Sequence, residues 1–347
     1  MMELLPFLIA AFATYISIVL LHPFALSSNL TDKPSKRKLH EGSIPLTGGI
    51  AMFVGIIIGT LLLPIDLNNL KYFLLTSLII VSVGVLDDHK DITVVIRLFF
   101  QVLVSILIIS GAGLSIYSFG NILGNGEILL NGWAYFLTVI LIIASINAVN
   151  MADGINGLAA GNSLITFLAI LFLAYDSINQ HGILIALLFC SVLPVFMMHN
   201  LCILVKKSKR IFMGDAGSMF IGIGIIWLLI EMSQGESRAF NPVIAAWLFA
   251  GPIFEMSGAI VRRVLAGTSP FKPDALHSHH ILMQLGIKSH YVLLILLFFS
   301  LLMAVIGILG TLYDVADWVM FVGFLLIFLV YLLSYRIAVR RLFIKKN

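Results

Sequence analysis

Three carboxylates lie within five residues of one another, directly after a long apolar run. The run "LLTSLIIVSVGV" leads into "LDDHKDI" (residues 86–92), which holds Asp87, Asp88 and Asp91, although the chain of 347 residues has only 17 acidic residues. On a helix Asp88 and Asp91 would share a face, whereas Asp87 and Asp88 would point about 100° apart. Clustered carboxylates repel one another unless a cation joins them, and hard oxygen ligands suit Mg²⁺ or Mn²⁺ bound together with phosphate oxygens. The alternative is a solvated loop in which Lys90 supplies the counter-charge.

A second polar cluster, "NAVNMADGING" (residues 147–157), places Asn147, Asn150 and Asp153 at intervals of three before two glycines. Asparagine can bind a hard metal through its carbonyl oxygen, or hydrogen-bond a base or a sugar. Its amide is costly at the end of an apolar span unless it has a partner. The glycines permit close approach of the backbone to a ligand, although a glycine that ends a helix is an alternative explanation.

Two further motifs add groups that suit phosphate chemistry. In "FMGDAGS" Asp215 lies between glycines and could approach a metal–phosphate closely, although a tight turn would also explain the motif. "HSHH" (residues 277–280) could bind zinc or donate hydrogen bonds to a diphosphate, and a surface histidine run is the alternative. Taken together, acids for a hard cation and histidines for phosphate predict phosphoryl chemistry on a diphosphate.

The elements that must position these motifs are membrane-spanning helices. Hydrophobic residues make up 60% of the chain and charged residues only 11%, whereas soluble domains carry about 25% charged residues. Because a spanning helix needs about 20 mostly apolar residues, we predict an all-α, polytopic integral membrane protein with about eleven spans, forming a single domain over residues 1–347. The spans are expected near residues 3–24, 45–64, 70–86, 93–111, 132–150, 157–175, 182–199, 211–231, 240–261, 291–312 and 316–337.

The distribution of lysine and arginine predicts how these spans are oriented. When the connections are assigned alternately to two sides, nineteen of the 21 basic residues fall on one side, and only Lys71 and Arg238 fall on the other. Positive charge collects in the cytoplasmic loops of membrane proteins. We therefore expect a periplasmic amino terminus, a cytoplasmic carboxyl terminus and all four motifs at one cytoplasm-facing cleft. The net charge of +4 then reflects topology and contact with the lipid bilayer, and not nucleic-acid binding.

The four motifs resemble, in content and in order, those of the polyprenyl-phosphate N-acetylhexosamine-1-phosphate transferases. "DKPSKRKLHEGSIPLTGGI", "VFMMHNLCILVKKSKRIFMGDAGS" and "SPFKPDALHSHHILMQLG" extend the similarity to the undecaprenyl-phosphate subgroup of Gram-negative bacteria, over nearly the whole chain. The resemblance implies transfer of N-acetylglucosamine 1-phosphate from UDP-N-acetylglucosamine to undecaprenyl phosphate in the bacterial inner membrane, with release of UMP. It also implies Mg²⁺ or Mn²⁺ as cofactor, a role in initiating O-antigen or enterobacterial common antigen synthesis, and a homodimer. The physical argument alone leaves open another UDP-N-acetylhexosamine.

The resemblance suggests roles for single residues. It implies that Asp215 binds the metal, that Asn150 and Asp88 share it, and that Asp87 and Asp88 form an essential acidic pair near the lipid phosphate. His279 and His280 are expected to be catalytic donors to the diphosphate. The residues expected to bind substrate are Asn147, Asp153 and Asn156 near the nucleotide, Phe212 stacked on uracil, and His277 on the diphosphate. Independently of the resemblance, Lys38 and Arg262 are candidates for holding a lipid phosphate, although membrane topology and headgroup contact also explain these basic residues.

One position departs from the subgroup. Its members usually read D-G-I-D-G, whereas this chain has Asn156 at the second acid. Asparagine loses the charge but gains a hydrogen-bond donor, which still suits uracil. We therefore expect substrate binding at residue 156, without a catalytic or metal-binding role.

Two questions of mechanism and class follow. The second pKa of a phosphate monoester is near ~6, so the lipid phosphate is mostly dianionic at pH 7 and needs little general-base help. Asp87 is then assigned to positioning, or to accepting a remaining proton, and a covalent route through an aspartate nucleophile stays open. A cation-coupled transporter is the rival class, but its polar residues would be expected near the bilayer midplane and not at the ends of spans.

Overall fold

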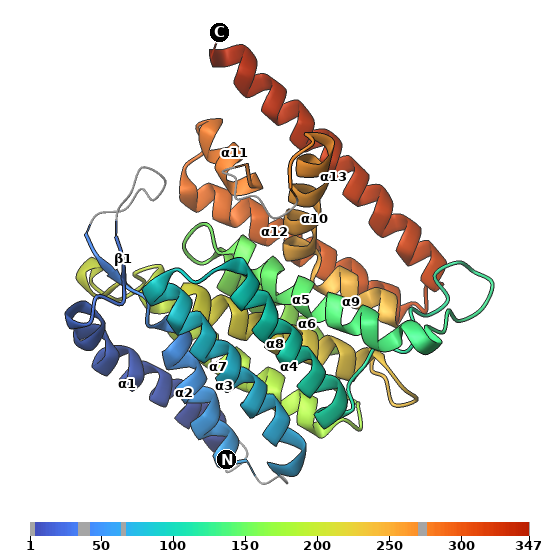
Figure 1. Cartoon of the computed structure of the whole chain (residues 1–347). Helices are drawn as coiled ribbons and strands as arrows, with labels where there is room; N and C mark the ends of the chain where they lie inside the picture. The colour runs from blue at the N-terminus through green and yellow to red at the C-terminus, as the bar shows by residue number, and fades with distance from the viewer. Residues whose placement is uncertain (1–3, 34–41, 64–66, 270–275, 347) are drawn as a thin grey trace.

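The structure, a computed structural model, describes residues 4–33, 42–63, 67–269 and 276–346. Its described part is mostly helical (Figure 1). The helices are α1 (Leu5–Ser27), α2 (Gly48–Leu61), α3 (Leu67–Lys90), α4 (Val94–Ala112), α5 (Ala134–Ala152), α6 (Leu158–Leu173), α7 (Gln180–Asn200), α8 (Gly214–Ser233), α9 (Pro242–Leu248), α10 (Ala250–Leu265), α11 (Ser278–Gln284), α12 (Ser289–Leu312) and α13 (Asp317–Lys346). The described residues also include short 3-10 helices at Asn131–Trp133 and Lys207–Lys209, and an antiparallel pair of two-residue strands, β1 (Thr31–Asp32) and β2 (Ile44–Pro45).

Eight helices in the described residues are long and apolar enough to cross a bilayer. They are α1, α3, α4, α5, α7, α8, α12 and α13, and each falls on a predicted span. The three other predicted spans fall on the shorter apolar helices α2 and α6 and on the bent pair α9–α10. The architecture is therefore that of a polytopic helical membrane protein with one small strand pair, and the number of eleven spans stays a prediction.

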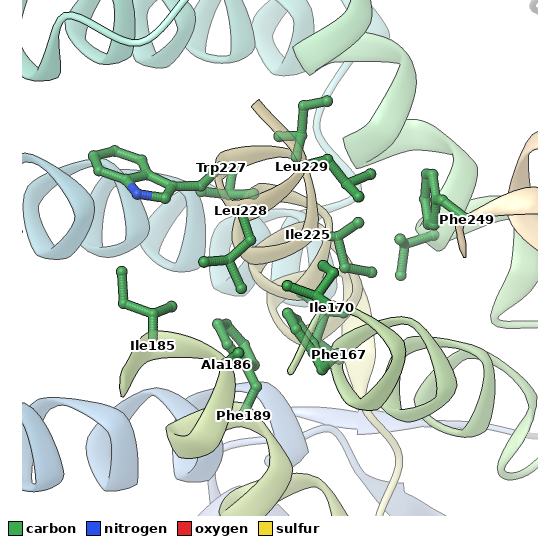
Figure 2. Packing of buried hydrophobic residues seen from close by; sticks show 14 of the residues in the cluster. Phe167, Ile170, Ile185, Ala186, Phe189, Ile225, Trp227, Leu228, Leu229 and Phe249 are labelled. Atoms are coloured by element: carbon green, nitrogen blue, oxygen red, sulfur yellow. The ribbon is translucent and has the colours of Figure 1, made fainter. Parts of the chain in front are cut away.

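Helix α8 forms the centre of the bundle. Every residue from Ala216 to Ile230 is buried, and the helix packs against α2, α3, α5, α6 and α7. A helix that is apolar on all sides can bury its whole circumference in such a core. Phe189 of α7 stacks on Phe167 of α6 with 4.4 Å between ring centroids, and Figure 2 shows these side chains gathered against α8. The core thus holds α8 rigidly along its length.

Two glycines bring neighbouring helices against the first turn of α8. A Cβ at Gly84 of α3 would collide with the backbone of Ala216, and a Cβ at Gly49 of α2 would collide with the backbone of Gly217. The predicted span ended at residue 86, but α3 continues to Lys90. The "LDDHK" segment is therefore the last turn of a helix, and its acids project beside the start of α8.

The span predicted over residues 240–261 is not one straight helix. Helices α9 and α10 meet at an angle of 85° around Phe249. Proline has no backbone N–H, so Pro252 cannot bond the carbonyl of Leu248 four residues earlier. That carbonyl instead accepts a hydrogen bond from the Thr166 hydroxyl at 2.8 Å. The sequence interpretation missed this break because the segment is mostly apolar on both sides of Phe249. The satisfied carbonyl explains how the break is tolerated inside the bundle.

Candidate functional site

The motif residues gather around one cavity of about 1740 Å³. Residues of β1, β2 and α11 are among those that line it, and Figure 1 shows where β1 and α11 lie. Pockets for one drug-sized ligand have volumes of about 300–1,000 Å³, so this cavity has room for two substrates. The predicted site residues that line it are Asp87, Asp88, Asn150, Asp153, Asn156, Phe212, Asp215 and His280.

Asp88 binds the amino-terminal end of α8. Its Oδ1 accepts the N–H of Asp215 at 2.8 Å and its Oδ2 accepts the N–H of Ala216 at 3.2 Å. A carboxylate at this position satisfies free N–H groups and lies at the positive end of the helix dipole. Gly214 has a φ of +70°, and a Cβ there would collide with the Asp88 carboxylate, so both the conformation and the space favour glycine. Asp88 therefore positions Asp215.

Asp215 stands at the centre of the acidic group. Its carboxylate interacts electrostatically with those of Asp87, Asp88 and Asp153. Asn150 donates from Nδ2 to Asp215 Oδ1 at 2.6 Å and to the Ser218 hydroxyl at 2.9 Å. These are oxygen-bearing side chains with a surplus of negative charge, which is the environment that a hard cation stabilises.

The donor set fits Mg²⁺. In the described part of the chain, no three His, Cys, Asp or Glu side chains form a ready-made metal cage. Mg²⁺ is usually held by one or two carboxylates, with waters and substrate phosphates completing its coordination. Asp215, with Asn150 and Asp88 beside it, matches that pattern, because turning the Asn150 amide would present its oxygen to the cation.

Asp87 is buried and held from two sides. Arg97 of α4 forms an ion pair with it, with Nη1 3.0 Å from Oδ2, but the geometry is not that of an aligned hydrogen bond. Oδ1 accepts the N–H of Ile92 at 3.0 Å. Asp91 forms the turn itself, with a φ of +50° and its N–H bonded to the Asp87 carbonyl at 2.8 Å. The three acids of "LDDHKDI" thus have three different environments.

Asn200 joins two segments of the cavity wall. Its Oδ1 accepts the N–H of Gly157 at 2.7 Å and its Nδ2 donates to the Ile211 carbonyl at 3.0 Å. The next residue, Phe212, donates its N–H to the Pro45 carbonyl at 2.9 Å and accepts the N–H of Gly48 at 3.0 Å. These bonds fix the loop that carries Asn156 relative to the predicted uracil-stacking ring of Phe212.

The three histidines of "HSHH" do not have equal access to the cavity. His280 lines it, whereas His277 and His279 are buried behind it. The His279 ring packs against Gly154, where a Cβ would collide with it. Within the described residues neither ring nitrogen of His279 has a hydrogen-bond partner. Burial, followed by the charge of His280, lowers the pKa of His279 to about 3, so this ring is neutral at pH 7.

Of the predicted substrate residues that the structure describes, Asn147 and Arg262, like His277, do not line the cavity. Asn147 lies one turn deeper than Asn150 and donates to Gln101 Oε1 at 2.9 Å and to the Ile143 carbonyl at 2.8 Å. Arg262 donates to the Leu276 carbonyl at 2.7 Å and stacks on Tyr335 at 4.1 Å from the ring centroid. Lys38 lies outside the described residues.

Known proteins resemble this chain over most of its length. Residues 70–233 match the model of glycosyl transferase family 4. A protein of Yersinia pestis named undecaprenyl-phosphate alpha-N-acetylglucosaminyl 1-phosphate transferase is 39% identical over 308 residues, which are 88% of this chain and 84% of that protein. Proteins of the same name from Escherichia coli O157:H7 and Haemophilus influenzae are 40% and 39% identical, cover 87% and 92% of this chain, and match over 82% and 90% of their own lengths. The chain belongs to glycosyl transferase family 4. The family membership predicted from the four motifs is thereby confirmed.

Several polar residues that support this family 4 site were missed by sequence reasoning. They share one property, a position within or at the end of an apolar span, and they are Arg97, Asn200 and Glu255. Polar groups in such spans are costly without a partner, so each was a signal that could have been followed. Their partners, however, come from other segments of the chain and are apparent only in the folded chain.

Proposed function

We propose that this chain transfers N-acetylglucosamine 1-phosphate from UDP-N-acetylglucosamine to undecaprenyl phosphate, and releases UMP. The observation that carries the proposal is the convergence of Asp215, Asn150 and Asp88 with Phe212 and Asn156 on one cavity of about 1740 Å³. The names of the similar proteins specify the acceptor and the transferred group. The UDP-linked donor follows from the family resemblance and from an aromatic ring and an amide placed on the cavity wall.

The reaction exchanges one phosphorus–oxygen bond for another. An oxygen of the lipid phosphate attacks the sugar-linked phosphorus, and the bond from that phosphorus to the bridging oxygen of UMP breaks. The bridging oxygen leaves with the electron pair. Because the attacking phosphate is mostly dianionic at pH 7, Asp87 acts mainly by position, held by Arg97 and the Ile92 N–H. His280 faces the cavity and can donate a hydrogen bond to the diphosphate.

A divalent cation completes the proposed site. Asp215, Asn150 and Asp88 are the residues that would hold Mg²⁺ or Mn²⁺. When bound, the ion offsets charge that develops on the diphosphate and on departing UMP. The protein's own contribution is to keep these three side chains together, which it does through the bonds from Asp88 to α8 and from Asn150 to Asp215.

The membrane placement is part of the proposal. We infer that the chain crosses the bacterial inner membrane eleven times, with its carboxyl terminus and its cavity on the cytoplasmic side. The asymmetry of lysine and arginine supports this orientation. It brings the cavity within reach of both a soluble nucleotide sugar and the headgroup of a membrane lipid.

The decisive assay measures UMP release from UDP-N-acetylglucosamine by purified protein in lipid nanodiscs. We expect release only when undecaprenyl phosphate and Mg²⁺ or Mn²⁺ are both supplied, and loss of release after chelation with EDTA. UDP-N-acetylgalactosamine assayed in parallel tests the choice of sugar. Absence of UMP with a competent acceptor present would refute the transferase assignment. Labelled protein formed from UDP-sugar without lipid would instead favour the covalent route.

A further inference from the structure

Glu255 of α10 is a buried carboxylate at the back of the histidine motif. Its side chain is 8% exposed. Both its oxygens accept the backbone N–H of Ser278, at 3.3 and 3.2 Å. Oε2 is also 3.3 Å from Nδ1 of His277, and Oε1 accepts a hydrogen bond from the Tyr331 hydroxyl at 3.4 Å. The carboxylate therefore contacts α11, the residue before it and α13 at once.

A buried carboxylate is tolerated in a fold only if hydrogen bonds from its partners offset the free-energy cost of removing it from water. A buried carboxylate without partners is strongly destabilising. Here the partners are mutually connected, because the Ser278 hydroxyl and the Tyr331 hydroxyl lie 2.9 Å apart. The bend between α9 and α10 directs α10 along a different line from α9, so this carboxylate depends on the broken helix to reach α11.

Contacts between the three histidine rings lead from Glu255 to the cavity. The rings of His277 and His279 are parallel within 2°, with centroids 5.6 Å apart. The ring centroids of His279 and His280 are 4.2 Å apart, and His280 lines the cavity. With Nδ1 of His277 donating to Glu255, the orientation and the tautomer of that ring are set by the carboxylate.

We propose that Glu255 is a positioning residue for the proposed transfer reaction: it anchors His277 and the start of α11, and so holds His280 at the cavity. This role rests on the proposed function. It predicts that Glu255 acts on turnover through His277, and that it has no contact with the nucleotide.

The test compares Glu255→Gln with Glu231→Gln in nanodiscs, with UMP release as the readout. Glu231 is a matched control because it is also an intramembrane glutamate, and it accepts a hydrogen bond from an aromatic side chain, the Trp227 indole, at 3.0 Å. It lies at the carboxyl-terminal end of α8, away from Asp215 in the first turn. We expect Glu255→Gln to lower kcat about 10- to 100-fold, the range found when the outer partner of a metal-bound histidine is lost. KM for UDP-N-acetylglucosamine should change less than about twofold, Glu255→Asp should recover part of kcat, and Glu231→Gln should match the wild type.

A double-mutant cycle separates positioning from general damage to the fold. If Glu255 acts through His277, the His277→Ala and Glu255→Gln effects on kcat will not add, and the double variant will resemble the worse single variant. Additive losses, or wild-type kcat in Glu255→Gln, would overturn the inference. If Glu255→Gln does not fold, Glu255→Asp gives the answer, because the shorter side chain moves the carboxylate away from His277: a reduced kcat supports the role, and an unchanged kcat overturns it. An inactive wild-type protein would instead overturn the proposed function, and this inference with it.

Discussion

Two of the helices that bring functional side chains to the cavity, α8 and α11, each begin at a carboxylate supplied by another helix. Asp88 of α3 binds two N–H groups at the start of α8, and Glu255 of α10 binds the Ser278 N–H at the start of α11. The two junctions differ in their surroundings. Helix α8 has 20 residues and lies in the core, whereas α11 has seven residues and packs mainly against α12 and α13.

This difference separates two ways of positioning a reactive group. Asp88 lines the cavity beside Asp215, so it serves both as a helix cap and as a member of the acidic group. Glu255 does not line the cavity, so its influence must pass through His277. The comparison therefore predicts that equivalent changes at the two junctions have unequal effects on turnover.

The largest expected effect is that of Asp88→Asn. The amide has one acceptor oxygen where the carboxylate has two, so one N–H of α8 loses its partner and Asp215 shifts. A misplacement of about 1 Å can cost on the order of 100-fold in rate, so we expect kcat to fall at least about 100-fold, and more than in Glu255→Gln. Steady-state UMP release measures both variants.

The control for this prediction is Asp91→Asn. Asp91 has a φ of +50°, a conformation that asparagine adopts readily. Its turnover should remain within about twofold of the wild type, because its backbone bond to Asp87 persists. Equal losses at residues 88 and 91 would contradict the separate roles assigned to these acids.

The next effect distinguishes the two asparagines on α5. Asn150→Ala removes the donor to Asp215 and a candidate metal ligand, and we expect a loss in kcat of about 10- to 100-fold with weaker Mg²⁺ activation. Asn147→Ala removes the bonds to Gln101 and to the Ile143 carbonyl, which lie off the cavity. We expect it to change the Mg²⁺ dependence little. A Mg²⁺ titration of UMP release measures both, and the same shift in both would place Asn147 in the site after all.

A smaller effect is expected from glycine substitutions beside each carboxylate. Gly84→Ala places a methyl group against the backbone of Ala216, whereas Gly258→Ala meets the Tyr331 ring at 2.9 Å, a side chain that can move. Overpacking against a backbone costs about 1–3 kcal/mol. We expect Gly84→Ala to lower the midpoint of thermal unfolding and reduce kcat about tenfold, with a milder change for Gly258→Ala. The reverse order would show that α11 has the more rigid junction.

The smallest effect on turnover is expected at the helix break that directs α10. Thr166→Val removes the hydroxyl that bonds the Leu248 carbonyl. An unsatisfied buried carbonyl costs about 1–3 kcal/mol, so the free energy of unfolding should fall while kcat stays within about twofold of the wild type. Thermal unfolding in detergent and UMP release measure the two quantities. A large loss of kcat at unchanged stability would link the break directly to the site.

Much of the site could be predicted from the chain because its residues occur in short motifs at the ends of apolar runs. Asp88, Asn150 and Asp215 come from three such motifs, and the fold brings them to one cavity. Asn147 shows where this reasoning stops. Its spacing resembles that of Asn150, but one helical turn places it beside Gln101 and away from the cavity.

The sequence by itself determined that this protein lies in a membrane, that it is helical and that it belongs to its family. It also determined the acidic, amide and histidine groups of the candidate site. These follow from composition and local spacing, which act along the chain. The tertiary structure alone decided the partners of those groups: Arg97 for Asp87, the α8 backbone for Asp88 and Glu255 for His277. Each partner lies on another helix, and in apolar spans many packings satisfy the same hydrophobic pattern. Close contacts, such as that of Gly84 with α8, select one of these packings. That packing determines which polar groups meet.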